Sequence, residues 1–179
     1  MKKEYPKPAL TADILVFTKN VENEREILLI QRKNDPFAGM WALPGGFVDE
    51  NEAVGEVARR ELQEETGVLL TEVTQMRTYS MPHRDPRGWT VSVAHIAFVE
   101  QENLCINAGD DAVEAAWFTL RWKKGNDEIV LQLQREKDIF EVRLISAGVA
   151  EDGYRIIKNG GLAFDHAKMI VAAIEEYID

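Results

Sequence analysis

The chain has 179 residues, of which 45% are hydrophobic and 29% are charged, and it carries a formal net charge of −10 at pH 7. These values are typical of a globular protein long enough to bury a core, and they exclude a disordered chain. The negative charge argues against a nucleic-acid partner, because binding a phosphate backbone needs a basic surface.

The apolar runs of the chain are too short to cross a bilayer, so no membrane partner is expected. The opening segment MKKEYPKPAL lacks the apolar stretch of a signal peptide, which predicts a cytoplasmic protein. A single cysteine excludes an internal disulfide framework and a cysteine metal cluster.

Alternating apolar residues predict strands, and apolar residues recurring every three or four positions predict helices. In chain order we expect strands at 12–18 and 26–32, a helix from about 52 to 66, strands at 71–81, 90–100 and 115–120, strand-like segments within 127–158, and a helix at 165–178. Strands mixed with only two helices predict an α/β or α+β sandwich.

The segment GGFVDENEAVGEVARRELQEETGV, residues 45–68, concentrates carboxylates on a short helix. Glu61, Glu64 and Glu65 lie at positions i, i+3 and i+4, so they project from one face. A solvated acidic face is the ordinary explanation, but Arg59 and Arg60 cannot neutralise all three carboxylates. Hard oxygen ligands suit Mg²⁺ or Mn²⁺, so the cluster predicts a metal site.

This segment resembles the Nudix box, which reads Gly, five residues, Glu, seven residues, then Arg-Glu-U-x-Glu-Glu-x-Gly-U with U a bulky aliphatic residue. The residues that fill its fixed positions are Gly46, Glu52, Arg60, Glu61, Leu62, Glu64, Glu65, Gly67 and Val68. The resemblance implies an α/β/α sandwich around a mixed β-sheet and Mg²⁺-dependent hydrolysis of a nucleoside diphosphate compound. It also implies that Glu61, Glu64, Glu65 and the Gly46 carbonyl bind metal, with Arg60 and Glu52 orienting the glutamates.

The flanking sequences are similar to the ADP-ribose pyrophosphatase branch of that family, including Pro82, fifteen residues after Gly67. This likeness implies cleavage of ADP-ribose to AMP and ribose 5-phosphate. The candidate substrate-binding residues are the arginines Arg32, Arg84 and Arg87, for phosphate or ribose oxygens, and the aromatics Phe37, Trp41 and Trp89, for stacking on adenine. Packing in the core or rim is the alternative for each aromatic, and pairing with Asp85 or solvation is the alternative for the loop arginines.

The loop GDDAVEAAW, in this family, can supply a further carboxylate as base or ligand, and Asp111 and Glu114 are the candidates. Two other functions stay open: hydrolysis of another nucleoside diphosphate compound, and non-catalytic sensing of ADP-ribose. The intact box, and the short sequence after residue 160, argue against the sensor.

Residues 121–160 are an insertion relative to the family pattern, within what we expect to be a single domain over 1–179. Their strand-like segments alternate apolar and polar residues and predict an extra small β-meander with one face that must be covered. We therefore expect the insertion to pack on the sandwich or on a second subunit, as in a homodimer.

Overall fold

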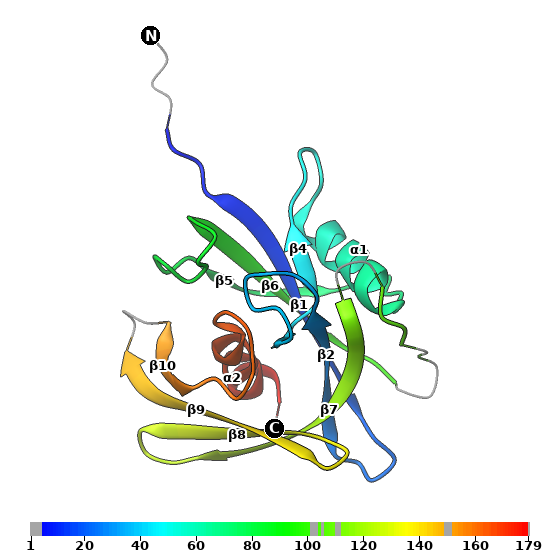
Figure 1. Ribbon diagram of the computed structural model, residues 1–179, viewed down its shortest axis with the longest axis vertical. Coiled ribbons are helices and arrows are strands. Elements are labelled where there is room, and N and C mark those ends of the chain that lie inside the picture. Colours follow the sequence, from blue (N-terminus) through cyan, green and yellow to red (C-terminus); the bar gives the residue numbers. More distant parts are fainter. Residues whose placement is uncertain (1–4, 101–103, 105, 110–111, 149–151, 179) are drawn as a thin grey trace.

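The computed structural model describes residues 5–100, 104, 106–109, 112–148 and 152–178. Figure 1 shows a strongly curled sheet with one helix on each side. The elements are β1 (Ala9–Lys19), β2 (Arg25–Arg32), β3 (Trp41–Ala42), β4 (Gly45–Phe47), α1 (Val54–Thr66), β5 (Thr74–Tyr79), β6 (Thr90–Phe98), β7 (Ala112–Lys124), β8 (Glu128–Arg135), β9 (Asp138–Gly148), β10 (Gly153–Lys158) and α2 (His166–Tyr177).

The sheet has the strand order β10-β9-β8-β7-β2-β1-β6-β5, with β3 paired to β2 and β4 paired to β1. Strands β1 and β6 pair in parallel, while their neighbours in the sheet pair antiparallel. A mixed sheet between helices is the expected Nudix α/β/α fold, so the predicted fold class is confirmed. No helix in the described part of the chain has the length and apolar character needed to cross a membrane.

Strand β1 is buried on both faces and divides the core in two. Its residues Leu15 and Phe17 belong to the cluster that includes α2, whereas Ala12, Ile14 and Val16 pack with α1. Side chains alternate between the faces of a strand, so Asp13 falls on the same face as Leu15. That placement puts a carboxylate inside the sandwich.

Helix α1 begins two residues later than predicted, because Ala53 has an extended backbone with φ −80° and ψ 141°. Its end matches the prediction, since Gly67 adopts the left-handed conformation with φ 74° that caps a helix. Residues 41–47 include the short strands β3 and β4. Strand β4 pairs with β1, which brings Gly45 and Gly46 beside α1.

The strands within residues 121–160, the segment expected to be an insertion, extend the main sheet and do not form a small sheet of their own. Strand β7 runs through residue 124 and pairs with β8, which pairs in turn with β9. The inner residues Leu131 and Val142 join the same buried cluster as Ile170 of α2. The insertion therefore packs on the sandwich, one of the two predicted outcomes.

We expect Leu131→Ala to lower the free energy of unfolding by about 3 kcal/mol, because the fully buried side chain would leave a cavity. Ile139→Ala on the adjacent strand is the matched control, since Ile139 is 59% exposed and should cost about 0.5 kcal/mol or less. Urea unfolding measures both. Equal losses for the two variants would mean that the insertion is not part of the core.

Candidate active site

Arg60 is the central residue of the carboxylate face of α1. Its Nε and Nη2 donate to the two oxygens of Glu52 at 2.9 and 3.0 Å. Its Nη1 donates to Glu61 at 2.7 Å and to Glu64 at 3.0 Å. Hydrogen bonds from Arg60 lower the pKa of Glu52, so this outer carboxylate is kept ionised. One guanidinium therefore contacts three carboxylates of the box, and its role in orienting them stays a prediction.

Glu65 lies on the buried side of the same helix and is only 5% exposed. Its carboxylate accepts a hydrogen bond of 2.9 Å from the backbone N–H of Gly45. Burial raises the pKa of Glu65 to about 8, and the carboxylates of Glu61 and Asp13 add to the rise against the Gly45 hydrogen bond. Burial also raises the pKa of Glu61. The site is therefore short of positive charge, a condition that a bound cation would relieve.

Gly46 lies directly against the carboxylate of Glu61. A Cβ atom on Gly46 would come within 2.3 Å of both Cδ and Oε1 of Glu61. Real Cβ contacts are never that short, so any side chain at this position would displace the glutamate. The glycine is thus required by the close approach of α1 to β4.

A cavity of about 310 Å³ opens between α1 and the glycine turn. It is lined by Glu61 and Glu65, by Gly45 and Gly46, and by the arginines Arg32, Arg60 and Arg87, among others. Among the described residues, no three Asp, Glu, His or Cys side chains are gathered closely enough to form a ready-made metal site. Glu64 is turned toward Arg60 and 41% of its side chain is exposed.

The chemistry of the donor set nevertheless fits a divalent cation. Glu61 and Glu65 present carboxylate oxygens to one cavity, and the backbone of Gly46 borders it. Oxygen ligands with room for water are what Mg²⁺ and Mn²⁺ prefer. Glu64 lies one helical turn from Glu61 at the edge of this group. The metal-ligand roles stay predictions.

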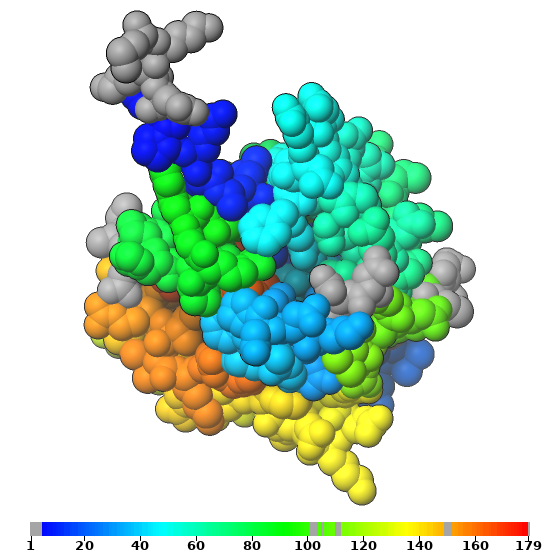
Figure 2. All heavy atoms as spheres, turned by 45° about the horizontal axis from the view of Figure 1, so that its top comes forward, coloured from blue at the N-terminus to red at the C-terminus, as the bar shows by residue number. Residues whose placement is uncertain are grey.

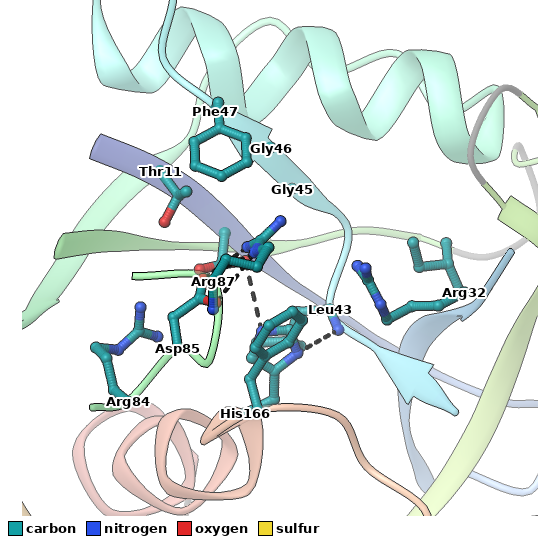
Figure 3. A pocket seen from close by; sticks show the side chains of 13 residues that line it. Thr11, Arg32, Leu43, Gly45, Gly46, Phe47, Arg84, Asp85, Arg87 and His166 are labelled. Atoms are coloured by element: carbon teal, nitrogen blue, oxygen red, sulfur yellow. Dashed lines mark hydrogen bonds and ion pairs between the residues drawn. The ribbon is translucent and has the colours of Figure 1, made fainter. Parts of the chain in front are cut away.

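A second, deeper pocket adjoins the cavity. The residues that line both are Ile30, Arg32, Gly45, Gly46, Phe47 and Arg87. Figure 3 shows this pocket with Arg84, Arg87 and Arg32 disposed around it. In Figure 2 the surface is hollowed between the cyan β4 region, the green loop before β6 and the light-blue loop after β2.

Two of these arginines are held by aspartates. Arg84 Nε and Nη2 donate to Asp165 at 2.9 and 2.6 Å, and both side chains are at most 10% exposed. Burial alone would lower the pKa of Arg84, but the Asp165 carboxylate outweighs it and raises that pKa. Arg87 pairs with Asp85, where Nη2 and Oδ2 are 2.7 Å apart. Burial opposes ionisation of Asp85, but the hydrogen bonds from Arg87 outweigh it and lower the pKa of Asp85.

His166 and Asp13 form the buried floor of the pocket. His166 Nδ1 accepts a hydrogen bond of 2.9 Å from the backbone N–H of Leu43, and its Nε2 lies 3.6 Å from Asp13 Oδ1. Ser92 Oγ donates to the other oxygen of Asp13. Burial lowers the pKa of His166 to about 3 and raises the pKa of Asp13. His166 is therefore neutral at pH 7, with Nδ1 as an acceptor and its proton on Nε2.

This histidine predicts a pH dependence of stability. The folded-state pKa of about 3 lies below the ordinary value of 6.5, so the unfolded chain binds the proton more readily. The contribution of His166 is complete above pH 6.5 and is lost as the pH falls toward 3, at up to about 1.4 kcal/mol per pH unit. His166→Asn should flatten the fall in unfolding free energy between pH 6.5 and 4, measured by urea unfolding. An unchanged slope would contradict the buried neutral imidazole. His83→Asn, on an exposed loop, is the control.

Only some of the residues predicted to bind substrate line the pocket. Arg32, Arg84 and Arg87 all line the pocket. Phe37 is partly buried and packs edge-on to Phe164 with ring centroids 4.7 Å apart. Trp89 is 57% exposed and lines neither the cavity beside α1 nor the deeper pocket.

Trp41 and Glu114 line a different cavity, bordered by Arg135 and Phe140. Trp41 is buried and packs edge-on to Phe118 at 4.7 Å, the core-packing alternative for these aromatics. Glu114 is paired with Arg135. Asp111, the other candidate carboxylate, lies outside the described residues.

The sequence-based interpretation did not identify Asp13, Phe47, Phe164 or His166 as lining residues of the pocket. Asp13 had a detectable signal, because a carboxylate within the apolar run ADILVFT is costly to bury without a purpose. Phe164 had none, since its place in the pocket depends on the contact between the 161–166 segment and β3.

Comparison with known proteins is consistent with this geometry. A family model, described as the NUDIX domain, matches residues 7–143. An ADP-ribose pyrophosphatase of Methanocaldococcus jannaschii is 45% identical over 116 residues, which cover 65% of this chain and 64% of that protein. The ADPR responsive transcriptional repressor NtrR of Acinetobacter baylyi is 40% identical over 100 residues, 55% of this chain and 40% of the repressor. The chain thus matches less than two thirds of the length of either relative.

Among solved structures, a MutT/nudix family protein from Enterococcus faecalis superposes with a TM-score of 0.81 at 38% identity, covering 100% of this chain and 65% of that one. The NUDIX domain of Shewanella oneidensis NrtR, complexed with ADP ribose, has a TM-score of 0.59 at 32% identity. That match covers 64% of this chain and 75% of the other.

Proposed function

The chain belongs to the Nudix family, and from this premise we propose that it hydrolyses the diphosphate of ADP-ribose to AMP and ribose 5-phosphate with Mg²⁺ or Mn²⁺ as cofactor. The observation that carries the proposal is the shared wall of two sites. The acidic cavity of Glu61 and Glu65 and the pocket of three arginines meet at Gly45, Gly46, Arg32 and Arg87. A diphosphate needs both, a cation site for its reacting oxygens and donors for the rest of its charge.

The substrate assignment is supported by the names of the relatives. The Methanocaldococcus jannaschii protein is an ADP-ribose pyrophosphatase, and the Shewanella oneidensis domain was solved with ADP ribose. In this chain the arginines would bind the phosphate oxygens of the substrate by charge-assisted hydrogen bonds.

The carboxylates of α1 would bind the cation. A bound divalent cation supplies charge withdrawal from the diphosphate oxygens and lowers the pKa of a water molecule. Glu61 and Glu65 would provide its carboxylate ligands together with the Gly46 carbonyl, and Arg60 would keep the Glu61 carboxylate in place. A carboxylate of the site, from α1 or from the segment before β7, would accept the proton of the attacking water.

The ADP-ribose assignment predicts an order of substrates. kcat/KM for ADP-ribose should exceed that for a nucleoside triphosphate such as dGTP at least about tenfold, because Arg84 and Arg87, which line the pocket, would hold the second sugar phosphate. Product release with Mg²⁺, measured on a panel that includes NADH, tests this order. A higher kcat/KM for dGTP would contradict the assignment of ADP-ribose as substrate but not the assignment as a Nudix hydrolase.

A non-catalytic sensor is the second candidate, favoured by the likeness to the NtrR repressor of Acinetobacter baylyi and to the ADP-ribose-bound NUDIX domain of Shewanella oneidensis NrtR. A sensor would bind ADP-ribose in calorimetry without releasing AMP in the presence of Mg²⁺. The hydrolase would do both.

A further inference from the structure

Two arginines from distant parts of the chain lie over one aromatic ring. Arg32, at the end of β2, has its Cζ 4.9 Å from the ring centroid of Phe164. Arg87, from the loop before β6, has its Cζ 5.0 Å from the same centroid. Arg87 also lies 4.6 Å from the ring of Phe47, so two aromatic rings contact its guanidinium.

The Phe164 ring offsets part of the repulsion between the two arginines. Two guanidinium groups near one ring repel each other, and repulsion disfavours their shared position. The negative face of an aromatic ring attracts a cation within about 6 Å of its centroid. Arg87 is also fixed by Asp85, while Arg32 Nε donates to the backbone carbonyl of Pro36 at 2.9 Å. The Phe164 ring is therefore an attractive group common to both arginines.

The ring is itself held firmly. Phe164 has φ 51°, a left-handed backbone conformation that is rare for a bulky residue. Ala163 N–H donates to the Trp41 carbonyl at 2.8 Å, and Trp41 N–H donates to Gly161 at 2.9 Å, which pins the segment to β3. Phe37 packs edge-on to the ring. These contacts hold the Phe164 segment in place beside both arginines.

We propose that Phe164 is a positioning residue that holds Arg32 and Arg87 toward the shared wall of the two cavities, ready to bind the anionic phosphates of the substrate. Both arginines line the acidic cavity and the deeper pocket, so their placement decides how the phosphates are held. The inference rests on the proposed function for its ligand. It adds that the aromatic character of residue 164, and not only its volume, sets the affinity.

The test is ADP-ribose binding by calorimetry in excess EDTA, where hydrolysis is not expected, together with steady-state kinetics in Mg²⁺. Phe164→Leu keeps the apolar volume and removes the ring, and it should raise Kd and KM about tenfold with kcat changed less than about threefold. Phe164→Tyr keeps the ring and should recover most of the lost affinity. Phe47→Leu, at an exposed position, removes a ring contact from Arg87 alone and should raise Kd about threefold, whether or not Phe164→Leu folds well.

The matched control is Phe98→Leu. Phe98 is half exposed and lies under Arg25 at 5.8 Å, but it lines neither cavity, so ADP-ribose affinity should not change. Wild-type affinity in both Phe164→Leu and Phe47→Leu would overturn the inference while the proposed function stands. Equal weakening in Phe164→Leu and Phe164→Tyr would also overturn it, because the ring would not matter. A wild-type protein that binds no ADP-ribose would instead overturn the proposed function, and the inference with it.

Discussion

Replacing Glu65 with glutamine should lower kcat for ADP-ribose by at least about 100-fold, equivalent to roughly 3 kcal/mol of transition-state stabilisation. The amide keeps the shape of the side chain and can still accept the hydrogen bond from Gly45 N–H. It cannot carry the negative charge that a divalent cation requires, and it cannot accept the proton of water. The loss should therefore appear in kcat and not in the fold.

The matched control for this variant is Glu56→Gln on the same helix. Glu56 is exposed and its carboxylate accepts a hydrogen bond from Ala53 N–H, a role that glutamine can also fill. Steady-state kinetics and circular dichroism on both variants make the comparison. A Glu65→Gln protein with near-wild-type kcat would mean that another residue carries the chemistry.

Replacing Asp165 with alanine should lower the free energy of unfolding by about 3 to 5 kcal/mol, the largest stability effect we expect at the site. Arg84 would be left buried without its carboxylate, at a position where the pair is almost completely removed from water. Arg84 also connects the loop before β6 to the start of α2, so the pocket should loosen as well. Urea unfolding at pH 7 measures the effect.

Two further variants isolate its cause. Asp165→Ala combined with Arg84→Met should be more stable than Asp165→Ala alone, because the uncompensated charge is removed. Glu24→Ala, which breaks the exposed pair with Arg121, should leave stability close to that of the wild type. If the double variant is no more stable than Asp165→Ala, the unpaired charge is not the source of the loss.

The parts of the account that depend on local pattern could be predicted from the sequence. The glutamates of α1, their spacing and the glycine that ends the helix are all local, and the structure agrees in helix and cap. Gly46 and Glu61 belong to the same local motif, but their close contact appears only in the fold.

The parts of the fold that depend on contacts between distant segments could not be predicted from the sequence. Alternating apolar and polar residues predict that 127–158 forms strands. The pattern does not show which strand pairs with which, so the pairing of β7 with β8 was not predicted. The curled sheet brings the 164–166 segment into contact with residues far away in the sequence. Phe164 contacts Arg87, Asp165 binds Arg84, and His166 binds the backbone of Leu43. The arginines of the loop before β6 were expected to bind anions, while the aspartates and the ring that fix them appear only in the fold.

Product analysis of ADP-ribose incubated with the wild-type protein, first with Mg²⁺ and then with excess EDTA, is the sharpest test of the proposed hydrolysis. We expect equal amounts of AMP and ribose 5-phosphate with Mg²⁺, no release in EDTA, and recovery when Mg²⁺ is restored. Binding of ADP-ribose with no AMP released under any of these conditions would contradict the proposed hydrolysis, and release that persists in EDTA would contradict the role of the metal.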